Sequence, residues 1–286
     1  MSAAGPGGFL AGERIAFLTQ HGKESVVAPR FREAFGAIVE RVHGFDTDRL
    51  GTFTRDIPRA GAQLDAARSK ARLGMRLSGL PRGLASEGAF GPDPVTGLVP
   101  WNVELLVFID DGLGVEVPAW AGGPAWHHHR TVTSDAELDR FCEEAGFPEH
   151  HLVVRPDDEN DPRITKGIRT REELRAAFHW AKAASKHGAV FVETDFRAHA
   201  NPTRMRMIAA AADELVGRLR TACPRCACPG FGVAGRIPGL PCSWCGAPTR
   251  IPKAVKRACP RCHHEELSHE PAAARADPGS CDDCNP

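Results

Sequence analysis

The 286-residue sequence has no tyrosine, no net charge and no long hydrophobic run. Lysine plus arginine equals aspartate plus glutamate at 36 each, so no overall electric field favours nucleic acid or an anionic membrane as a partner. No window approaches the roughly eighteen apolar residues of a membrane span, and residues 1–10 lack the basic and apolar regions of a secretory signal. These absences predict a soluble protein that does not enter a membrane and resides in the cytoplasm.

Motifs of several common enzyme classes are also missing. The sequence has no P-loop and no G-x-G-x-x-G after a predicted strand. The segment G-L-A-S-E-G lacks the glycine two residues before Ser86 that a nucleophile elbow requires. Together with the absence of tyrosine, this argues against hydride transfer, kinase-like phosphoryl transfer and serine hydrolysis.

Cysteine, in contrast, is concentrated near the C-terminus, where eight of the ten cysteines form four C-x-x-C pairs. Each pair can present two thiolates to one metal from a tight turn, and tetrahedral zinc takes two such pairs. Fifteen residues separate the first two pairs and eighteen the last two, which fits four-cysteine zinc sites, and a reducing cytoplasm disfavours disulfides. The sequence predicts two structural Zn²⁺ ions, with sequential and interleaved pairing both open. The predicted ligands are Cys223, Cys226, Cys242, Cys245, Cys259, Cys262, Cys281 and Cys284.

A site closed by four thiolates has no open position for a substrate, so zinc is expected to stabilise structure without performing catalysis. Of the two remaining cysteines, Cys228 is expected to be a bystander near the first pair. Cys142, beside Phe141 on an apolar helix face, is expected to be a small core residue. The run His127–His129 is expected in a surface loop.

Strands and helices alternate over most of the remaining chain, which predicts an α/β fold with a mixed sheet and flanking helices. Residues 1–217 are assigned to this domain and residues 218–286 to a double zinc ribbon of the rubredoxin-like type. Ser134, Thr170 and Asn201 are predicted helix N-caps. The predicted strands are 15–18, 103–109, 115–117, 152–155 and 189–193, and the predicted helices are 30–42, 60–78, 135–145, 171–187 and 202–220.

Two segments between these elements have distinctive turn chemistry. Asp111-Gly112 between apolar runs predicts a β-hairpin. The glycine-rich segment 83–91 predicts a short strand that breaks into a loop, where the backbone approaches another group closely.

Charged side chains gather where the predicted strands end, which is where open α/β sheets bind ligands. Carboxylates suit Mg²⁺, and lysine or arginine suits phosphate oxygens, so these residues can form a site that cleaves pyrophosphate or phosphoesters. Helix capping, ion pairing and turn formation are alternative roles for the same residues. The candidate catalytic residues are Lys23, Glu24, Glu87, Asp195, Arg197 and His199, and the candidate ligands of Mg²⁺ or substrate are Asp46, Asp48 and Lys70.

The C-terminal segment is locally basic. Nine lysines and arginines and no acidic residue lie between Leu215 and His264. Six acidic residues follow directly, and each zinc with four thiolates carries about two negative charges, so the segment is close to neutral overall. Nucleic-acid binding through Phe231 and Trp244 is therefore possible in principle but is not favoured over a self-balanced structural module.

The order of motifs in residues 13–120 resembles the inosine triphosphate pyrophosphatase family. The shared elements are T-Q-H-G-K-E after the first strand, D-T-D-R-L-G-T-F, the helix A-A-R-S-K-A and the segment G-L-P-R-G-L-A-S-E-G. The resemblance implies that Lys23 and Lys70 contact phosphate and that Glu24 and Glu87 act as metal ligands or base. The chain differs from that family in having A-S-E-G in place of a double aspartate.

The whole chain resembles a bacterial family without an established activity. The shared motifs are D-T-D-x-L-G-T-F, A-S-E-G-x-F-G-P, E-T-D-x-R-A-H-x-N-P-T-R-M and paired C-x-x-C knuckles that end in C-D-x-C-N-P. This resemblance implies an α/β domain followed by a double zinc ribbon and leaves the chemistry open.

Three functional hypotheses follow. The first is a Mg²⁺-dependent hydrolase of a nucleotide or phosphorylated small molecule with a structural zinc tail. The second is an adaptor that binds nucleic acid or protein through the zinc ribbons. The third is a small-molecule binding protein without catalytic activity, and the sequence leaves the oligomeric state open.

Overall fold

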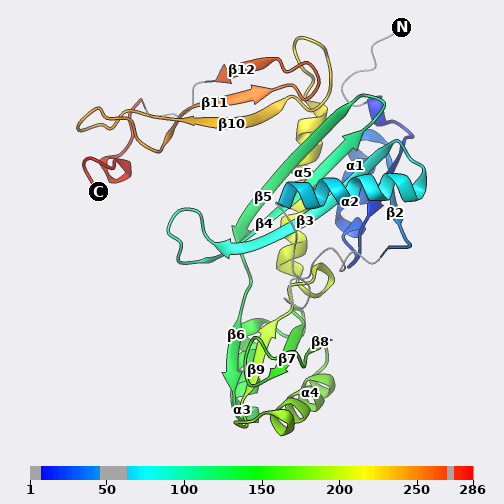
Figure 1. The fold of residues 1–286 in the computed structure, drawn as a ribbon, viewed down its shortest axis with the longest axis vertical. Helices are drawn as coiled ribbons and strands as arrows, with labels where there is room; N and C mark the ends of the chain where they lie inside the picture. Colours follow the sequence, from blue (N-terminus) through cyan, green and yellow to red (C-terminus); the bar gives the residue numbers. More distant parts are fainter. Residues whose placement is uncertain (1–7, 46–62, 269–273, 286) are drawn as a thin grey trace.

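The computed structural model describes residues 8–45, 63–268 and 274–285, and these residues form three separate β-sheets (Figure 1). We call residues 8–220 the body and the described residues from 221 to 285 the arm. The body holds two sheets with helices, and the arm holds one sheet without helices longer than a single turn. Asp46 and Asp48 lie outside the described residues.

The larger sheet of the body has five strands in the order β2-β1-β3-β4-β5. Strand β1 is parallel to both of its neighbours, whereas β3, β4 and β5 form an antiparallel meander. Strand β3 extends well past the end of β1, and among the described strands its second half pairs with β4 alone. The strands are β1 (Arg14–Leu18), β2 (Ile38–Val42), β3 (Arg82–Pro92), β4 (Pro100–Asp110) and β5 (Val115–Pro124).

Helices cover both faces of this sheet. Helices α1 (Glu24–Phe35) and α5 (Pro202–Arg220) pack on one face against Leu106 and Phe108. Helix α2 (Gln63–Ser78) packs on the other face against Leu105 and Val107. We call these the α5 face and the α2 face. Successive strand residues point to opposite faces, so each position on β3 and β4 belongs to one of them.

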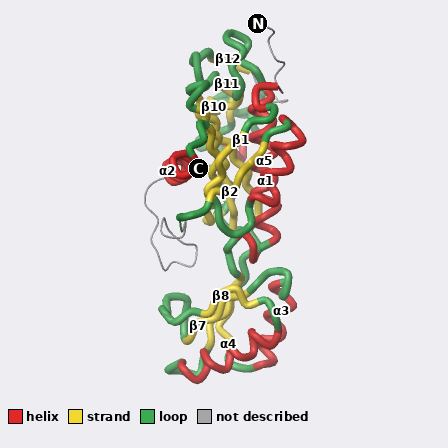
Figure 2. The backbone as a smooth tube through the Cα atoms, turned by 90° about the vertical axis from the view of Figure 1, so that its right-hand side faces the viewer, coloured by secondary structure: helices red, strands yellow, loops and turns green. Residues whose placement is uncertain are grey.

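The smaller sheet of the body has four strands in the order β6-β9-β7-β8, and α3 and α4 supply its helical cover. It has a hydrophobic core of its own, built around Phe141 and Phe178. Figure 2 shows this unit next to the five-stranded unit along the long axis of the molecule. Its elements are β6 (His129–Val132), α3 (Asp135–Ala145), β7 (Leu152–Pro156), β8 (Thr165–Ile168), α4 (Arg171–Ala184) and β9 (Val190–Thr194).

The arm is an antiparallel sheet of three strands that projects sideways from the end of α5 (Figure 1). Its strands are β10 (Gly232–Pro238), β11 (Pro252–Ala258) and β12 (Glu265–Ser268). One C-x-x-C turn precedes β10, one lies between β10 and β11, one lies between β11 and β12, and one follows β12. The strands therefore separate the cysteine pairs into two groups at the two ends of the sheet.

Several predictions from local patterns are confirmed. The Asp111-Gly112 segment joins the antiparallel strands β4 and β5. Ser134, Thr170 and Asn201 each accept a hydrogen bond from a backbone amide in the first turn of α3, α4 and α5. Thr170 forms the complete capping box with Glu173.

Two predictions are wrong. The helix predicted over 30–42 ends at Phe35, because Gly36 adopts φ = 68° and the next residues pair with β1 as strand β2. The loop predicted after Gly83 is instead continuous strand, because β4 pairs with β3 up to Pro92. The close backbone approach is nevertheless present, since a Cβ atom on Gly88 would clash with Glu104 Oε1.

Candidate functional site

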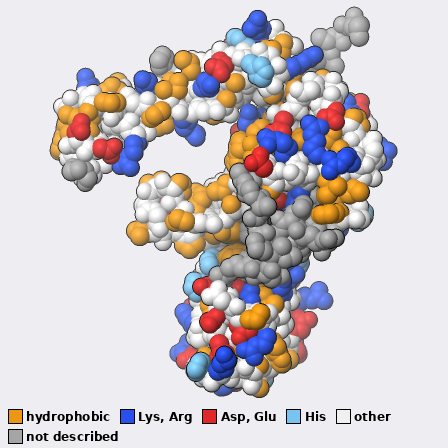
Figure 3. Space-filling view, viewed as in Figure 1, with side chains coloured by type: hydrophobic (Ala, Val, Ile, Leu, Met, Phe, Trp, Pro, Cys, Tyr) orange, Lys and Arg blue, Asp and Glu red, His pale blue; other side chains and the backbone are white. Residues whose placement is uncertain are grey.

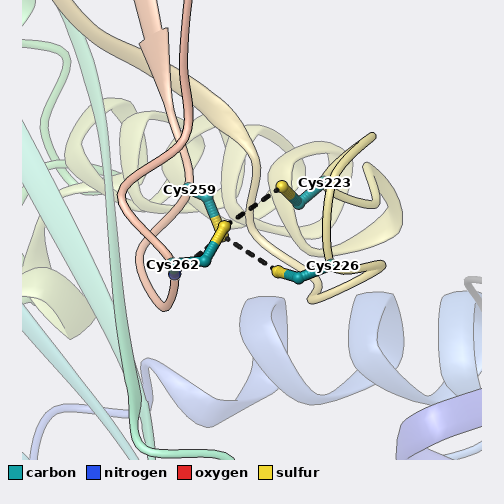
Figure 4. A group of neighbouring side chains, drawn as sticks. All are labelled: Cys223, Cys226, Cys259 and Cys262. Atoms are coloured by element: carbon teal, nitrogen blue, oxygen red, sulfur yellow. Dashed lines mark hydrogen bonds between the residues drawn. The ribbon is translucent and has the colours of Figure 1, made fainter.

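The four C-x-x-C pairs form two groups of four cysteines, and the pairing is interleaved. Cys223 and Cys226 meet Cys259 and Cys262 where the arm leaves the body (Figure 4). The second and fourth pairs meet at the far end of the arm. Within each group the ligand atoms all lie within 4.8 Å of one another. The second group consists of Cys242, Cys245, Cys281 and Cys284.

The geometry of both groups fits zinc. Tetrahedral coordination with Zn–S bonds of about 2.3 Å requires sulfur atoms about 3.8 Å apart. The Sγ atoms of Cys223 and Cys262 are 3.7 Å apart, and those of Cys242 and Cys284 are 3.9 Å apart. Backbone N–H groups stabilise the thiolates: those of Cys245 and Trp244 lower the pKa of Cys242 to about 7. Two four-cysteine clusters that can hold zinc are therefore present.

The two clusters differ in their surroundings. The first is part of a small hydrophobic cluster that includes Phe231 of the arm and Val115 of β5. Cys228 belongs to the same cluster, where burial raises its pKa to about 11, and it is not among the four grouped sulfur atoms. At the second cluster Cys245 is exposed and the neighbouring Trp244 is 78% exposed. The first cluster thus fastens the arm to the body, and the second closes its free end.

Charged residues of the body converge at the carboxyl end of β1. Lys23, just before α1, is 7% exposed, and its Nζ donates to Ser86 Oγ over 3.3 Å. On the α2 face, Lys70 of α2 forms an ion pair with Glu87 of β3, and both side chains are nearly buried. The structure therefore brings together three of the residues that the sequence predicted for the site. We call these three residues, together with the ion pair of Arg204 and Glu104, the ionic cluster.

A second buried ion pair completes the ionic cluster on the α5 face. Arg204, in the first turn of α5, donates from Nε to Glu104 Oε1 of β4 over 2.7 Å, and both side chains are at most 2% exposed. Asn102, two residues earlier on β4, donates from Nδ2 to the same oxygen over 3.1 Å. Glu104 pairs with Gly88 whereas Glu87 pairs with Leu105, so the two glutamates project from opposite faces of the sheet.

Two hard oxygen atoms on the α5 face accept no hydrogen bond from the described residues. They are Glu104 Oε2 and Asn102 Oδ1, and both are buried. Buried carboxylate and amide oxygens without a donor cost free energy unless a ligand, metal or water satisfies them. Carboxylate and amide oxygens are also the ligands that Mg²⁺ prefers.

The pKa of Lys23 is affected by both buried ion pairs, Lys70–Glu87 on the α2 face and Arg204–Glu104 on the α5 face. Burial, followed by repulsion from Arg204, lowers the pKa of Lys23 from 10.5 to about 7, although Glu104 and Glu87 act in the opposite direction. This amine is therefore divided between its charged and neutral forms near neutral pH. An arriving phosphate would favour the charged form, because opposite charges nearby raise the pKa of an amine.

Sequence reasoning missed Glu104, Asn102 and Arg204. Glu104 lies within the predicted apolar strand 103–109 and Asn102 directly precedes it, yet Glu104 is the sole charged residue between Asp93 and Asp110. A single carboxylate within a buried strand was the available signal, because such a group needs a partner.

The remaining predicted site residues make other contacts. Asp195, after β9, is fully buried and pairs with Arg197 over 2.6 Å. Its carboxylate also accepts from the backbone N–H of Gly167. Glu24 pairs with Arg41 of β2 over 3.2 Å. These two ion pairs are separate from the pairs of the ionic cluster.

His199 links the two units of the body. Its ring stacks on His21, which precedes Lys23 in the same loop, with a centroid distance of 4.8 Å. Burial, with further effects of His21 and Arg197, lowers the pKa of His199 to about 4, so this ring is neutral at neutral pH. The 3-10 turn that carries it (Ala198–Ala200) joins the four-stranded sheet to α5.

An apolar pocket adjoins the ionic cluster. It has a volume of about 370 Å³, and its lining includes Phe90, Trp101, His127 and Phe196. The rings of Phe90 and Phe196 lie 4.4 Å apart. Arg204 lies over the Phe90 ring at 5.8 Å and donates to the backbone oxygen of Phe196 over 2.6 Å, which places the pocket next to the α5 face of the cluster.

Comparisons with known proteins identify a family and no activity. A family model described as a domain of unknown function, DUF6671, matches residues 70–286. Neither the curated proteins nor the solved structures gave a match. No helix among the described residues combines the length and apolar character that crossing a bilayer requires. Because the match covers well over half of the chain, from within α2 to the C-terminal end of the arm, the chain belongs to the DUF6671 family.

Proposed function

We propose that this protein is a Mg²⁺-dependent hydrolase of a nucleotide or related phosphoester, with two structural zinc ions in a double zinc ribbon. The observation that carries the proposal is the pair of buried oxygens, Glu104 Oε2 and Asn102 Oδ1, which lack a hydrogen-bond donor among the described residues beside two cationic side chains. The resemblance of residues 13–120 to inosine triphosphate pyrophosphatases supports the same class of reaction.

The residues have distinct proposed roles. Glu104 and Asn102 would hold Mg²⁺, which neutralises phosphate charge and lowers the pKa of a bound water. Lys23 and Arg204 bind and orient phosphate oxygens on the α5 face. Because positioned cations act where charge develops in the transition state, they contribute to rate as well as affinity.

Glu87 and Lys70 have a proposed role on the other side of β3. Lys70 and Glu87 form a nearly buried ion pair on the α2 face, and both groups act on the pKa of Lys23. We therefore propose that they position and tune the phosphate-binding lysine, with Glu87 also available as a base.

The apolar pocket supports a nucleotide as the substrate class. Its aromatic lining offers faces for a planar base, while the cationic side chains beside it suit the phosphates. Its volume of about 370 Å³ lies within the range of small-molecule sites.

The proposal is tested by assaying the full zinc-loaded chain on a panel of nucleoside mono-, di- and triphosphates for phosphate and pyrophosphate release with and without Mg²⁺. We expect Mg²⁺-dependent turnover of at least one substrate and a loss of about 100-fold in Asn102→Leu and Lys23→Met. The matched controls Asn160→Leu and Lys186→Met alter exposed loop residues of the smaller unit and should retain activity. Turnover of no substrate, or ligand-induced melting shifts without product, would contradict catalysis.

A further inference from the structure

The loop between β3 and β4 projects from the body and exposes apolar side chains. We call residues 93–99 the β3–β4 tip. Val95 is 89% exposed, Leu98 85% and Val99 46%. In Figure 3 this loop forms a lobe at the side of the body, and the visible face of the lobe consists of hydrophobic and uncharged atoms. Because the lobe is convex, it is shaped to enter an apolar partner and not to enclose one.

Charged residues are scarce on the tip and on the strands that support it. Residues 88–103 contain one charged side chain, Asp93, and residues 117–126 contain none, although charged residues make up 25% of the chain. A surface that is exposed, apolar and free of charged side chains over several neighbouring residues is typical of an interaction site.

Asp93 provides the hydrogen-bond acceptors that the backbone of the tip requires. It is 9% exposed, and its carboxylate accepts from Thr96 Oγ1 and from four backbone N–H groups. The hydrogen bonds from the backbone of Thr96 and Val99 hold the pKa of Asp93 well below its usual range. The backbone donors to the carboxylate are Val95, Thr96, Leu98 and Val99.

Every backbone N–H group from Asp93 to Val99 is donated within the tip. The N–H of Gly97 donates to the backbone oxygen of Asp93, and the N–H of Asp93 donates to the backbone oxygen of Val99. Pro94 has no N–H group to satisfy. A backbone N–H without an acceptor opposes entry into hydrocarbon, because no water is present there to accept its hydrogen bond. The tip therefore leaves water without losing a hydrogen bond of any backbone donor.

Two tryptophans lie behind the tip on the α2 face of the sheet. Trp101 pairs with Pro124 and Trp120 pairs with Leu105, and the alternation of β4 assigns both indoles to the face of Leu105. A Cβ atom on Gly122 would lie 2.8 Å from Trp101 Nε1, so this indole lies over Gly122. Trp120 is 44% exposed. Indoles concentrate where the headgroups of a bilayer meet its hydrocarbon.

We infer that the β3–β4 tip inserts into the surface of a lipid bilayer, with Val95, Leu98 and Val99 in the hydrocarbon boundary and the two indoles at headgroup level. A bilayer accepts a convex tip of any shape, whereas a protein groove has to match it. Neutral lipid is the expected partner, because the tip carries no basic residue. A search for long apolar runs does not detect such a surface, because a shallow and reversible contact needs only a few apolar side chains.

The test measures flotation of the full zinc-loaded chain with phosphatidylcholine vesicles, without nucleotide or Mg²⁺, so its result does not depend on the proposed hydrolase activity. We expect Leu98→Asp to lower the partition coefficient by at least about tenfold, because a carboxylate is unfavourable in the hydrocarbon boundary. The matched control Leu267→Asp changes a 61% exposed leucine of β12 and should bind like the unmodified chain. Zinc content and melting temperature confirm that each variant is folded.

The variant Asp93→Ala separates lipid insertion from simple hydrophobic contact. It removes a negative charge, which alone would strengthen partition into neutral vesicles. It also leaves four backbone N–H groups of the tip without their acceptor. We expect the second effect to dominate and to lower the partition coefficient by about tenfold. Equal or tighter binding of Asp93→Ala would overturn the inference.

Tryptophan quenching tests the depth of the contact. Lipids brominated near the headgroup should quench the fluorescence of the bound chain. This quenching should fall in Trp101→Phe/Trp120→Phe and persist in Trp180→Phe, which replaces an exposed tryptophan of α4. Equal quenching in the two variants would contradict the proposed orientation.

Other outcomes assign the tip or the binding elsewhere. Binding limited to anionic vesicles and abolished by high salt would place the contact on basic side chains and would overturn the inference. Equal loss of binding in Leu98→Asp and Leu267→Asp would overturn it as well. A dimer in sedimentation equilibrium that Leu98→Asp dissociates, without binding to vesicles, would assign the tip to a second copy of the chain.

Discussion

The body and the arm of this protein are stabilised by different means. The body buries large side chains completely, among them Phe17, Phe31 and Phe108 in one unit and Phe141 and Phe178 in the other. In the described part of the arm, the buried apolar residues other than cysteines are Phe231, Leu240, Ala254, Val255 and Ala276. So small a core cannot offset the conformational entropy of about 60 residues, and metal binding must supply the difference. Apolar packing therefore stabilises the body, whereas the arm depends on its two four-cysteine clusters.

Removing zinc should have the largest effect on the folded structure, and the loss of structure should be confined to the arm. Structural zinc sites contribute on the order of 10 kcal/mol or more to folding. We expect a strong chelator to abolish amide protection in β10, β11 and β12, while β1, β4 and β9 keep theirs in hydrogen-exchange mass spectrometry. The double variant Cys259→Ser/Cys281→Ser should reproduce this pattern without chelator. Loss of protection in both regions would show that the body also depends on the metal.

Breaking the buried ion pair should have the next largest effect, confined to the body. Arg204→Met leaves Glu104 charged and buried without its partner, which typically costs about 3–5 kcal/mol in the free energy of unfolding. The control Arg130→Met breaks the exposed pair with Glu144 and should cost less than about 1 kcal/mol. Urea denaturation followed by tryptophan fluorescence measures both. Equal costs for the two variants would refute a buried, tightly coupled pair.

The pH dependence of stability should distinguish Lys23 from ordinary lysines. Its pKa in the fold is about 7 against 10.5 when unfolded, so the unfolded chain binds more protons between these values. The free energy of unfolding should therefore rise with pH from about 7 toward 10.5. In Lys23→Met this part of the rise should disappear, whereas Lys186→Met should retain it. Identical pH profiles for the two variants would show that Lys23 titrates normally.

The smallest effect is expected at the free end of the arm. Trp244 is 78% exposed, so Trp244→Ala should change the free energy of unfolding by no more than about 0.5 kcal/mol. Zinc stoichiometry and thermal denaturation check this result. A large loss would mean that the indole protects the second four-cysteine cluster and that apolar packing stabilises the arm after all.

Features governed by local chemistry were predictable from the sequence. The four C-x-x-C turns, the caps at Ser134, Thr170 and Asn201, and the hairpin at Asp111-Gly112 all depend on residues a few positions apart. The interleaved pairing of the cysteines was not predictable, because it depends on how the strands of the arm align. Strand β2 was missed because Ile38 and Val42 fit a helical repeat as well as a strand, and pairing with β1 decides the outcome.

The candidate site was predictable in part for the same reason. Lys23 follows β1, Glu87 lies on the neighbouring strand β3, and Lys70 lies on α2, which packs on both strands, so the structure brings the three together. Glu104 and Arg204 are 100 residues apart, and only the packing of α5 on β4 joins them. Asp195 and Arg197 also follow a strand, but that strand belongs to the other sheet, and the two residues bind each other.

The most direct test of the division between the two regions is Mg²⁺-dependent nucleotide hydrolysis by two variants of the full chain. Asn102→Leu removes a proposed Mg²⁺ ligand from the body, and Cys245→Ser/Cys284→Ser weakens the second four-cysteine cluster at the free end of the arm. We predict that the first variant keeps two zinc ions per chain and loses turnover by about 100-fold. The second should lose one zinc ion and keep turnover within about twofold. Full activity in Asn102→Leu, or loss of activity together with the zinc ion, would contradict the assignment of chemistry to the body.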